Sequence, residues 1–101
     1  RGTELGVFRS VTVLPSLLVV IEGDAPFVKV FDHHGKLVQS FGRAGAGPGE
    51  FRSPGAVAYD SVNRILWISD ARLGRVTQFV VGDTLRWASE HRTRHTSPNE
   101  T

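Results

Sequence analysis

The chain has 101 residues, of which 40% are hydrophobic and 22% are charged, and its formal net charge is +2. This composition is typical of one small soluble globular domain and excludes a disordered polar chain. A charge this small does not by itself indicate nucleic-acid or membrane binding, and the lack of cysteine excludes disulfides and thiolate metal sites. The sequence also lacks methionine, so we expect a fragment or a processed product, with any signal peptide lying before Arg1.

The first half of the chain contains four short runs of β character that are separated by turn residues. These runs cover residues 10–13, 17–22, 27–32 and 36–41. The short turns predict antiparallel hairpins, because parallel strands need a long crossover connection. We therefore expect one four-stranded antiparallel sheet, called blade one, at about residues 6–41.

A connector rich in glycine and proline follows at residues 42–54. Its four glycines and two prolines disfavour both helix and regular strand. Phe51 provides an apolar anchor, so we expect an ordered loop rather than a flexible linker. A phosphate-binding interpretation is disfavoured, because Pro48 has no backbone N–H and a strand rather than a helix follows.

The second half of the chain repeats this arrangement. Its β-like runs cover residues 55–60, 65–70, 75–80 and 85–88, and they predict blade two at about residues 55–88. Residues 89–101 contain no aliphatic side chain, and we interpret them as a polar, disordered tail. The folded part is therefore expected to span residues 1–88.

The two halves coincide without a gap when residues 65–70 are laid over residues 17–22, and we call this superposition the repeat alignment. The offset between the halves is 48 residues. A repeat of this length indicates stacked supersecondary units, which normally need about three copies for stability. The inner runs, 17–21 and 65–68, are apolar at every position, which indicates strands buried on both faces, with Trp67 in the core. Antiparallel sheets covered on both sides predict an all-β fold of β-propeller type, of which this chain would form an incomplete ring.

Two motifs carry a resemblance to a known family. Residues 42–51 read Gly-Arg-Ala-Gly-Ala-Gly-Pro-Gly-Glu-Phe, which is similar to a loop of the form G-R-x-G-x-G-P-G-E-F. Residues 70–79 resemble the pattern D-x-x-N-x-R-V-x-x-F, with Leu73 in place of Asn, whereas blade one has Glu22 for the Asp and Phe27 for the Arg. Together these motifs resemble the six-bladed β-propellers of the NHL type, in particular a bacterial group with this inter-blade loop.

The resemblance implies two consecutive blades of an NHL-like propeller and an exported bacterial protein. Members of the family are peptide- or RNA-binding platforms, and relatives are metal-dependent lyases and lactonases, so the fold does not decide the function. We favour a non-catalytic binding or scaffold module for a protein, peptide or glycan. The alternatives are a fragment of a propeller enzyme with an axial metal site and an RNA-binding platform. Further blades or self-association would have to cover the apolar outer faces.

Four arginines are the candidates for a ligand face, namely Arg43, Arg52, Arg72 and Arg75. In a propeller the connector and the turn between the second and third strands share one face, so these side chains could form a basic patch for an acidic peptide or RNA. No aromatic residue is interleaved for base stacking, which disfavours RNA, and solvated loop charges without a ligand are the favoured interpretation of these arginines. Asp70 and Arg75 flank a four-residue turn, and we interpret them as a structural pair that braces it.

No cofactor, metal or catalytic residue is assigned. His33 and His34 are adjacent, which is a poor geometry for chelating one ion. His91 and His95 have the i, i+4 spacing of a helical zinc pair, but Arg92 stands where a zinc protease carries its glutamate. No Ser, His and Asp set can be assembled from the sequence.

Overall fold

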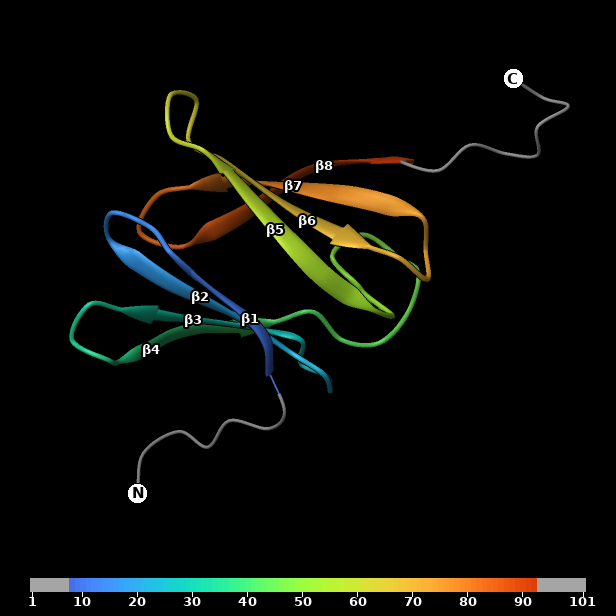
Figure 1. Ribbon diagram of the computed structural model, residues 1–101, viewed down its shortest axis with the longest axis horizontal. Helices are drawn as coiled ribbons and strands as arrows, with labels where there is room; N and C mark the ends of the chain where they lie inside the picture. The colour runs from blue at the N-terminus through green and yellow to red at the C-terminus, as the bar shows by residue number, and fades with distance from the viewer. Residues whose placement is uncertain (1–7, 93–101) are drawn as a thin grey trace, which may run out of the picture.

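The computed structural model describes residues 8–92, which form eight β-strands and no helix (Figure 1). The strands are β1 (Phe8–Val13), β2 (Leu17–Glu22), β3 (Val28–Asp32), β4 (Leu37–Phe41), β5 (Pro54–Asp60), β6 (Ile65–Asp70), β7 (Arg75–Val81) and β8 (Leu85–Arg92). Strands β1 to β4 form one antiparallel sheet in chain order, the first sheet, and β5 to β8 form the second sheet. The predicted all-β class with two four-stranded antiparallel sheets is confirmed.

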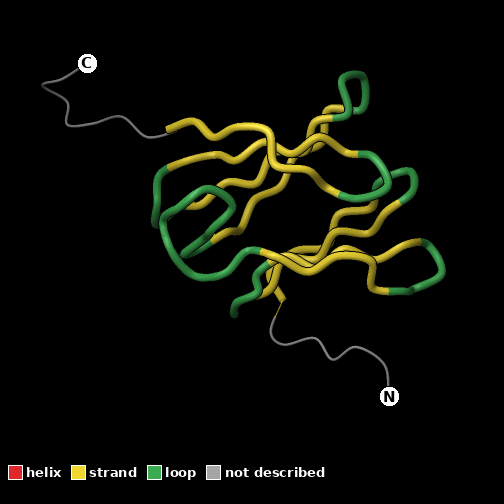
Figure 2. The backbone as a smooth tube through the Cα atoms, turned by 180° about the vertical axis from the view of Figure 1, so that it is seen from behind, coloured by secondary structure: helices red, strands yellow, loops and turns green. Residues whose placement is uncertain are grey.

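The two sheets face each other, and the connector joins them at one end (Figure 2). Corresponding strands lie beside one another. At β1 and β5, the Ser10 hydroxyl donates to the Gly55 carbonyl at 3.3 Å. At β4 and β8, the Gln39 side-chain amide donates to the Leu85 carbonyl and accepts from the Leu85 N–H, both at 2.8 Å. The sheets are therefore stacked in the same strand order.

One hydrophobic core fills the space between the sheets. It combines alternate residues of the central strands with Leu85 of β8 and with three residues from outside the strands, Leu14, Phe27 and Phe51. The full set is Leu14, Leu17, Val19, Ile21, Phe27, Val28, Val30, Phe51, Leu66, Ile68, Phe79, Val81 and Leu85. Phe51, from the connector, is completely buried and packs edge-on against Phe27 with ring centres 6.4 Å apart. The connector thus contributes to the core, because its phenylalanine lies between the two sheets.

The two inner strands differ in how their outer faces are covered. In β2 both Val19 and Val20 are buried, as the unbroken apolar run predicts. In β6 the burial alternates, and Trp67 is 36% exposed on the face that points away from the first sheet. The expected burial of Trp67 in the core is therefore wrong for this chain, because nothing in the described part of the chain packs over that face.

The last strand is longer than the sequence indicates. Strand β8 continues to Arg92, so the predicted end of blade two at residue 88, and the disordered tail from residue 89, are placed too early. Composition misled the prediction, because an edge strand is held by backbone pairing to β7 while its side chains can all be polar. The rest of that tail, including His95, lies outside the described residues.

Candidate functional site

The connector and the β6–β7 turn form one end of the two-sheet unit, which we call the connector end, and Asp70 holds them together. This carboxylate is 1% exposed. It accepts backbone N–H bonds from Arg52 at 2.7 Å and Ser53 at 3.0 Å in the connector. It also accepts from Arg72 at 3.1 Å and Leu73 at 3.0 Å in the turn. One side chain therefore fixes two loops that are far apart in the sequence.

Arg75 also fixes the connector. Its guanidinium donates to the carbonyls of Ala46 at 2.8 Å and of Gly47 and Glu50 at 2.7 Å, and it also contacts the Glu90 carboxylate at 3.2 Å. Arg75 is only 8% exposed, so it is not available to a surface ligand and is removed from the ligand-face candidates. The planar guanidinium is suited to this role because it presents several N–H groups in a fixed fork.

The predicted side-chain pair of Asp70 and Arg75 is corrected by these contacts. Their backbones are cross-strand partners at the start of β7, but each side chain is occupied by the connector instead. Both residues brace this end of the sheet, and they do so separately.

The glycines of the connector are needed where its backbone meets side chains. Gly42 has φ +91°, and a Cβ there would lie 2.9 Å from the Phe51 ring. A Cβ on Gly45 would collide with the Glu50 carboxylate, which accepts from the Gly47 N–H at 2.9 Å and from Arg43 Nε at 2.9 Å. The Gly47 N–H, followed by Arg43, lowers the pKa of Glu50 below its ordinary value, so this side chain stays an acceptor.

Three of the four predicted arginines remain exposed at the connector end, namely Arg43, Arg52 and Arg72. Arg52 and Arg72 are brought together because their backbone N–H groups bind the same Asp70 carboxylate. A hollow of about 250 Å³ lies at the same end of the second sheet, lined by Ala46, Leu73, Arg75, Glu90, His91 and Arg92. Sequence reasoning missed Arg92, because it was assigned to the tail; its pairing with Arg75 in the β7–β8 ladder brings it to the same end.

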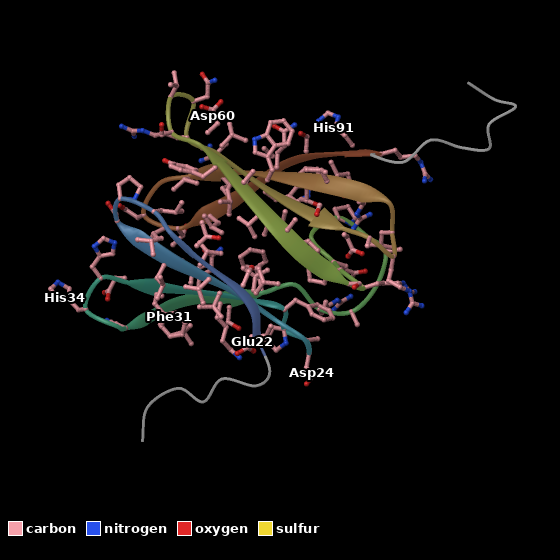
Figure 3. The ribbon with its side chains drawn as sticks, in the orientation of Figure 1. Glu22, Asp24, Phe31, His34, Asp60 and His91 are labelled. Atoms are coloured by element: carbon pink, nitrogen blue, oxygen red, sulfur yellow. The ribbon has the colours of Figure 1, made fainter. Side chains whose placement is uncertain are left out.

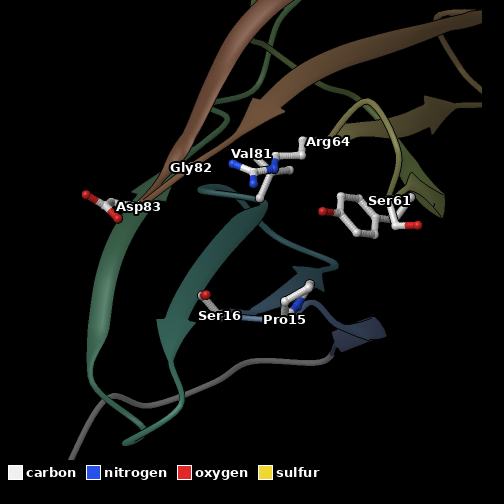
Figure 4. A pocket seen from close by; sticks show the side chains of 8 residues that line it. Pro15, Ser16, Ser61, Arg64, Val81, Gly82 and Asp83 are labelled. Atoms are coloured by element: carbon white, nitrogen blue, oxygen red, sulfur yellow. The ribbon is translucent and has the colours of Figure 1, made fainter.

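An open cleft of about 400 Å³ lies at the opposite, hairpin end, between the two sheets (Figure 4). It is lined by Pro15, Ser16, Tyr59, Ser61, Arg64, Val81, Gly82 and Asp83. Arg64 has φ +59°, a left-handed conformation that is uncommon for residues other than glycine. The cleft offers one cation, one anion and several hydroxyl groups to a small polar molecule.

Two further carboxylates, Asp32 and Asp60, cap turns at the ends of strands. The Lys36 N–H lowers the pKa of Asp32, which also accepts from His34 N–H at 2.8 Å. The Asn63 side chain lowers the pKa of Asp60, with help from backbone N–H bonds. Asp24 and His34 lie at opposite ends of the first sheet (Figure 3).

The three histidines of the described range lie in two places, His33 and His34 in the β3–β4 turn and His91 in β8. His33 Nε2 lies 3.1 Å from the Leu14 carbonyl, and His91 Nε2 lies 3.3 Å from the Ser89 hydroxyl. Between residues 8 and 92, no three His, Asp or Glu side chains gather as a metal site.

The sequence matches no protein-family model and no curated protein. A solved structure of similar fold is that of a protein from Bacteroides fragilis that is predicted to be exported, with a TM-score of 0.76 and 20% sequence identity. The alignment covers 91% of this chain and 26% of that one, so this chain spans about a quarter of its structural neighbour. A likeness at this identity shows the fold alone. No helix in the described range is long and apolar enough to cross a bilayer.

Proposed function

We propose that the two sheets are consecutive blades of an NHL-like β-propeller and that the chain is a non-catalytic module that binds an acidic peptide segment of a protein. The observation that carries the binding proposal is the group of exposed arginines at the connector end, Arg43, Arg52, Arg72 and Arg92. Within the described part of the chain, no carboxylate binds the side chains of Arg52, Arg72 or Arg92. They are therefore available to a negatively charged partner.

The way the sheets are stacked supports the propeller architecture. The face of the first sheet that enters the core carries Leu17, Val19 and Ile21, whereas the second sheet uses Leu66 and Ile68. In the repeat alignment, Leu66 and Ile68 correspond to Leu18 and Val20, on the other face of β2. The two sheets thus bury opposite faces, as units do when they follow one another around an axis. A two-fold sandwich of repeats would bury the same face twice.

Binding is favoured over catalysis by the state of the acidic side chains. Asp70 accepts four backbone N–H bonds, and Glu50 is held by Gly47 and Arg43. Asp32 and Asp60 cap turns, and the pKa values of both are lowered by these bonds. A general acid or base needs a pKa near the working pH, so the lowered pKa values of Glu50, Asp32 and Asp60 suit these three carboxylates to holding structure.

An exposed aromatic side chain against the connector supports a peptide ligand. Trp87 is 42% exposed, and a Cβ on Gly49 of the connector would lie 4.0 Å from its ring. An acidic peptide with an apolar residue would therefore meet both charge and an aromatic surface. The fold likeness to a protein predicted to be exported supports the same setting for this chain, outside the cytoplasm.

Fluorescence anisotropy with a labelled peptide of six glutamates and one leucine tests this proposal. The double variant Arg52→Ala with Arg72→Ala removes two exposed side chains and leaves the backbone bonds to Asp70 in place. We expect it to bind the peptide about five- to ten-fold more weakly, since exposed charge contacts contribute up to about 1 kcal/mol each. The control Arg64→Ala with Arg86→Ala removes the same charge near the hairpin end and should bind like the parent chain.

Two results would overturn the proposal. Equal weakening by both double variants would mean that the peptide responds only to net charge. Tighter binding of a uridine hexamer than of the peptide, lost in the Arg52 and Arg72 variant, would favour the RNA-binding alternative instead.

A further inference from the structure

The outer face of the first sheet carries apolar residues at the same repeat positions as the residues that the second sheet contributes to the core. Phe31 lies on the side of the first sheet that points away from the second (Figure 3). Its strand register places Leu18 beside it, and Val20, Val11 and Val13 follow on the same face. In the repeat alignment, the set Val11, Leu18, Val20 and Phe31 becomes Tyr59, Leu66, Ile68 and Phe79, which all lie in or against the core.

The outer face of the second sheet in turn carries residues at the same repeat positions as those that the first sheet contributes to the core. In the repeat alignment, the core residues Leu17, Val19 and Val28 become Ile65, Trp67 and Val76. A shallow apolar hollow of about 310 Å³ lies there, lined by Ala56, Val57, Ala58, Trp67, Ser69 and Val76. Two polar residues, Ser69 and Gln78, stand where the first sheet has Ile21 and Val30, so this half is less apolar than its counterpart.

We infer that these two outer faces bind each other between copies of the chain, head to tail. The occupant of the second sheet's outer face is the first sheet of a second copy, packed as the first and second sheets pack within one chain. The inference rests on the stacked architecture of the proposed function, but not on its peptide ligand. The interface between the two sheets within one chain is the template for the contact between copies, because it joins faces with residues at the same repeat positions.

The exposed apolar side chains lie where this contact needs them. Val11 is 47% exposed on the first sheet's outer face and Trp67 is 36% exposed on that of the second, and their counterparts in the repeat alignment, Tyr59 and Val19, lie against or in the core. A contact between different patches on two copies is heterologous, so each copy keeps one unused face and can bind another. Strands β1 and β5 contact each other within the chain, where Ser10 is bonded to Gly55. In an assembly of copies packed in the same way, β1 and β5 would be the strands that lie nearest the common axis.

Two charged substitutions test the head-to-tail contact by light scattering after size-exclusion chromatography. Val11→Glu blocks the outer face of the first sheet, because Val11 corresponds to Tyr59, which packs against the core, and Trp67→Glu blocks that of the second. The parent chain should associate with rising concentration, and each variant should require at least about 100-fold more protein to do so, because a charge would be buried without a partner. Thr84→Glu is the control: Thr84 is exposed in the β7–β8 turn, its counterpart Lys36 in the repeat alignment is also exposed, and its substitution should leave association unchanged.

Mixing the two blocked variants is the decisive step. Each still has one intact face of the opposite kind, so an equimolar mixture should form a dimer that neither forms alone. A parent chain that stays monomeric would overturn the inference, and so would a Val11→Glu variant that dimerises by itself through its second sheet. Circular dichroism confirms that both variants keep their β-structure. Peptide binding at the connector end is measured on the same monomeric variants, so the proposed function can succeed or fail independently.

Discussion

The two sheets solve the same structural problem at the connector end with different chemistry. In the second sheet, Asp70 and Arg75 bind the connector through backbone N–H and carbonyl groups. The corresponding positions of the first sheet hold Glu22 and Phe27. The Glu22 carboxylate accepts a hydrogen bond from Lys29 Nζ at 2.6 Å, and Phe27 packs on Phe51. One repeat holds the loop by polar contacts and the other by apolar contact. The shared fold therefore depends on the strands, and the residues at the loop positions can vary.

The largest expected effect comes from the apolar side of this comparison. Phe27→Ala removes a buried ring from between the sheets, and we expect a loss of about 3–4 kcal/mol in the free energy of unfolding. Arg75→Ala should cost less, about 2 kcal/mol, because the connector carbonyls it releases can bind water. Urea unfolding at a fixed protein concentration measures both. If Arg75→Ala were the more damaging variant, the polar contacts would dominate the attachment of the connector.

Asp70→Asn tests the polar side more closely. An amide keeps one acceptor oxygen but turns an NH₂ group toward backbone donors, so some of the four N–H groups lose their partner. We expect a loss of about 2–3 kcal/mol in urea unfolding. Asp60→Asn is the matched control, because Asp60 makes similar bonds in an exposed turn where water can replace them. A control as damaging as Asp70→Asn would show that burial does not set the cost.

The sequence predicts the strands well because the apolar runs and the turn residues between them indicate the same strand boundaries. Residues 17–22 and 65–70 were expected as strands and form β2 and β6 with those bounds. The short turns required antiparallel order, and both sheets have it. The exposure of Trp67 could not be read from the sequence, because an apolar strand looks the same whether or not a neighbour covers it.

The candidate site was predicted only in part, for two physical reasons. Arg52 lies in the connector and Arg72 in the β6–β7 turn, and the strand topology brings these two loops to the same end of the sheets. The proximity of the two arginines could therefore be predicted. The burial of Arg75 depends on three backbone carbonyls of a loop whose path is not encoded in any residue pattern. Arg92 was missed because the pairing of an edge strand leaves little trace in its side chains.

Acid should weaken both sheets through their turn carboxylates. The pKa values of Asp32 and Asp60 are lowered in the folded chain, first by the Lys36 N–H and by the Asn63 side chain respectively. A depressed folded pKa contributes stability above the unfolded value of 3.8, and this stability is lost as the pH falls through the folded pKa. We expect the melting temperature to fall below about pH 4, and to fall less steeply in the Asp32→Asn and Asp60→Asn double variant. An unchanged slope would assign the acid sensitivity to other groups.

The smallest expected effect compares two turns of the second sheet. The β5–β6 turn ends at Arg64 with φ +59°, and the β6–β7 turn ends at Gly74 with φ +63°. Left-handed backbone costs a residue with a Cβ about 1–2 kcal/mol, whereas glycine adopts it freely but loses more chain entropy on folding. Arg64→Gly should therefore raise the free energy of unfolding by up to about 1 kcal/mol, and Gly74→Ala should lower it by about 1 kcal/mol. Urea midpoints measure both, and a destabilised Arg64→Gly variant would mean that the Arg64 side chain stabilises the hairpin end by more than its backbone costs.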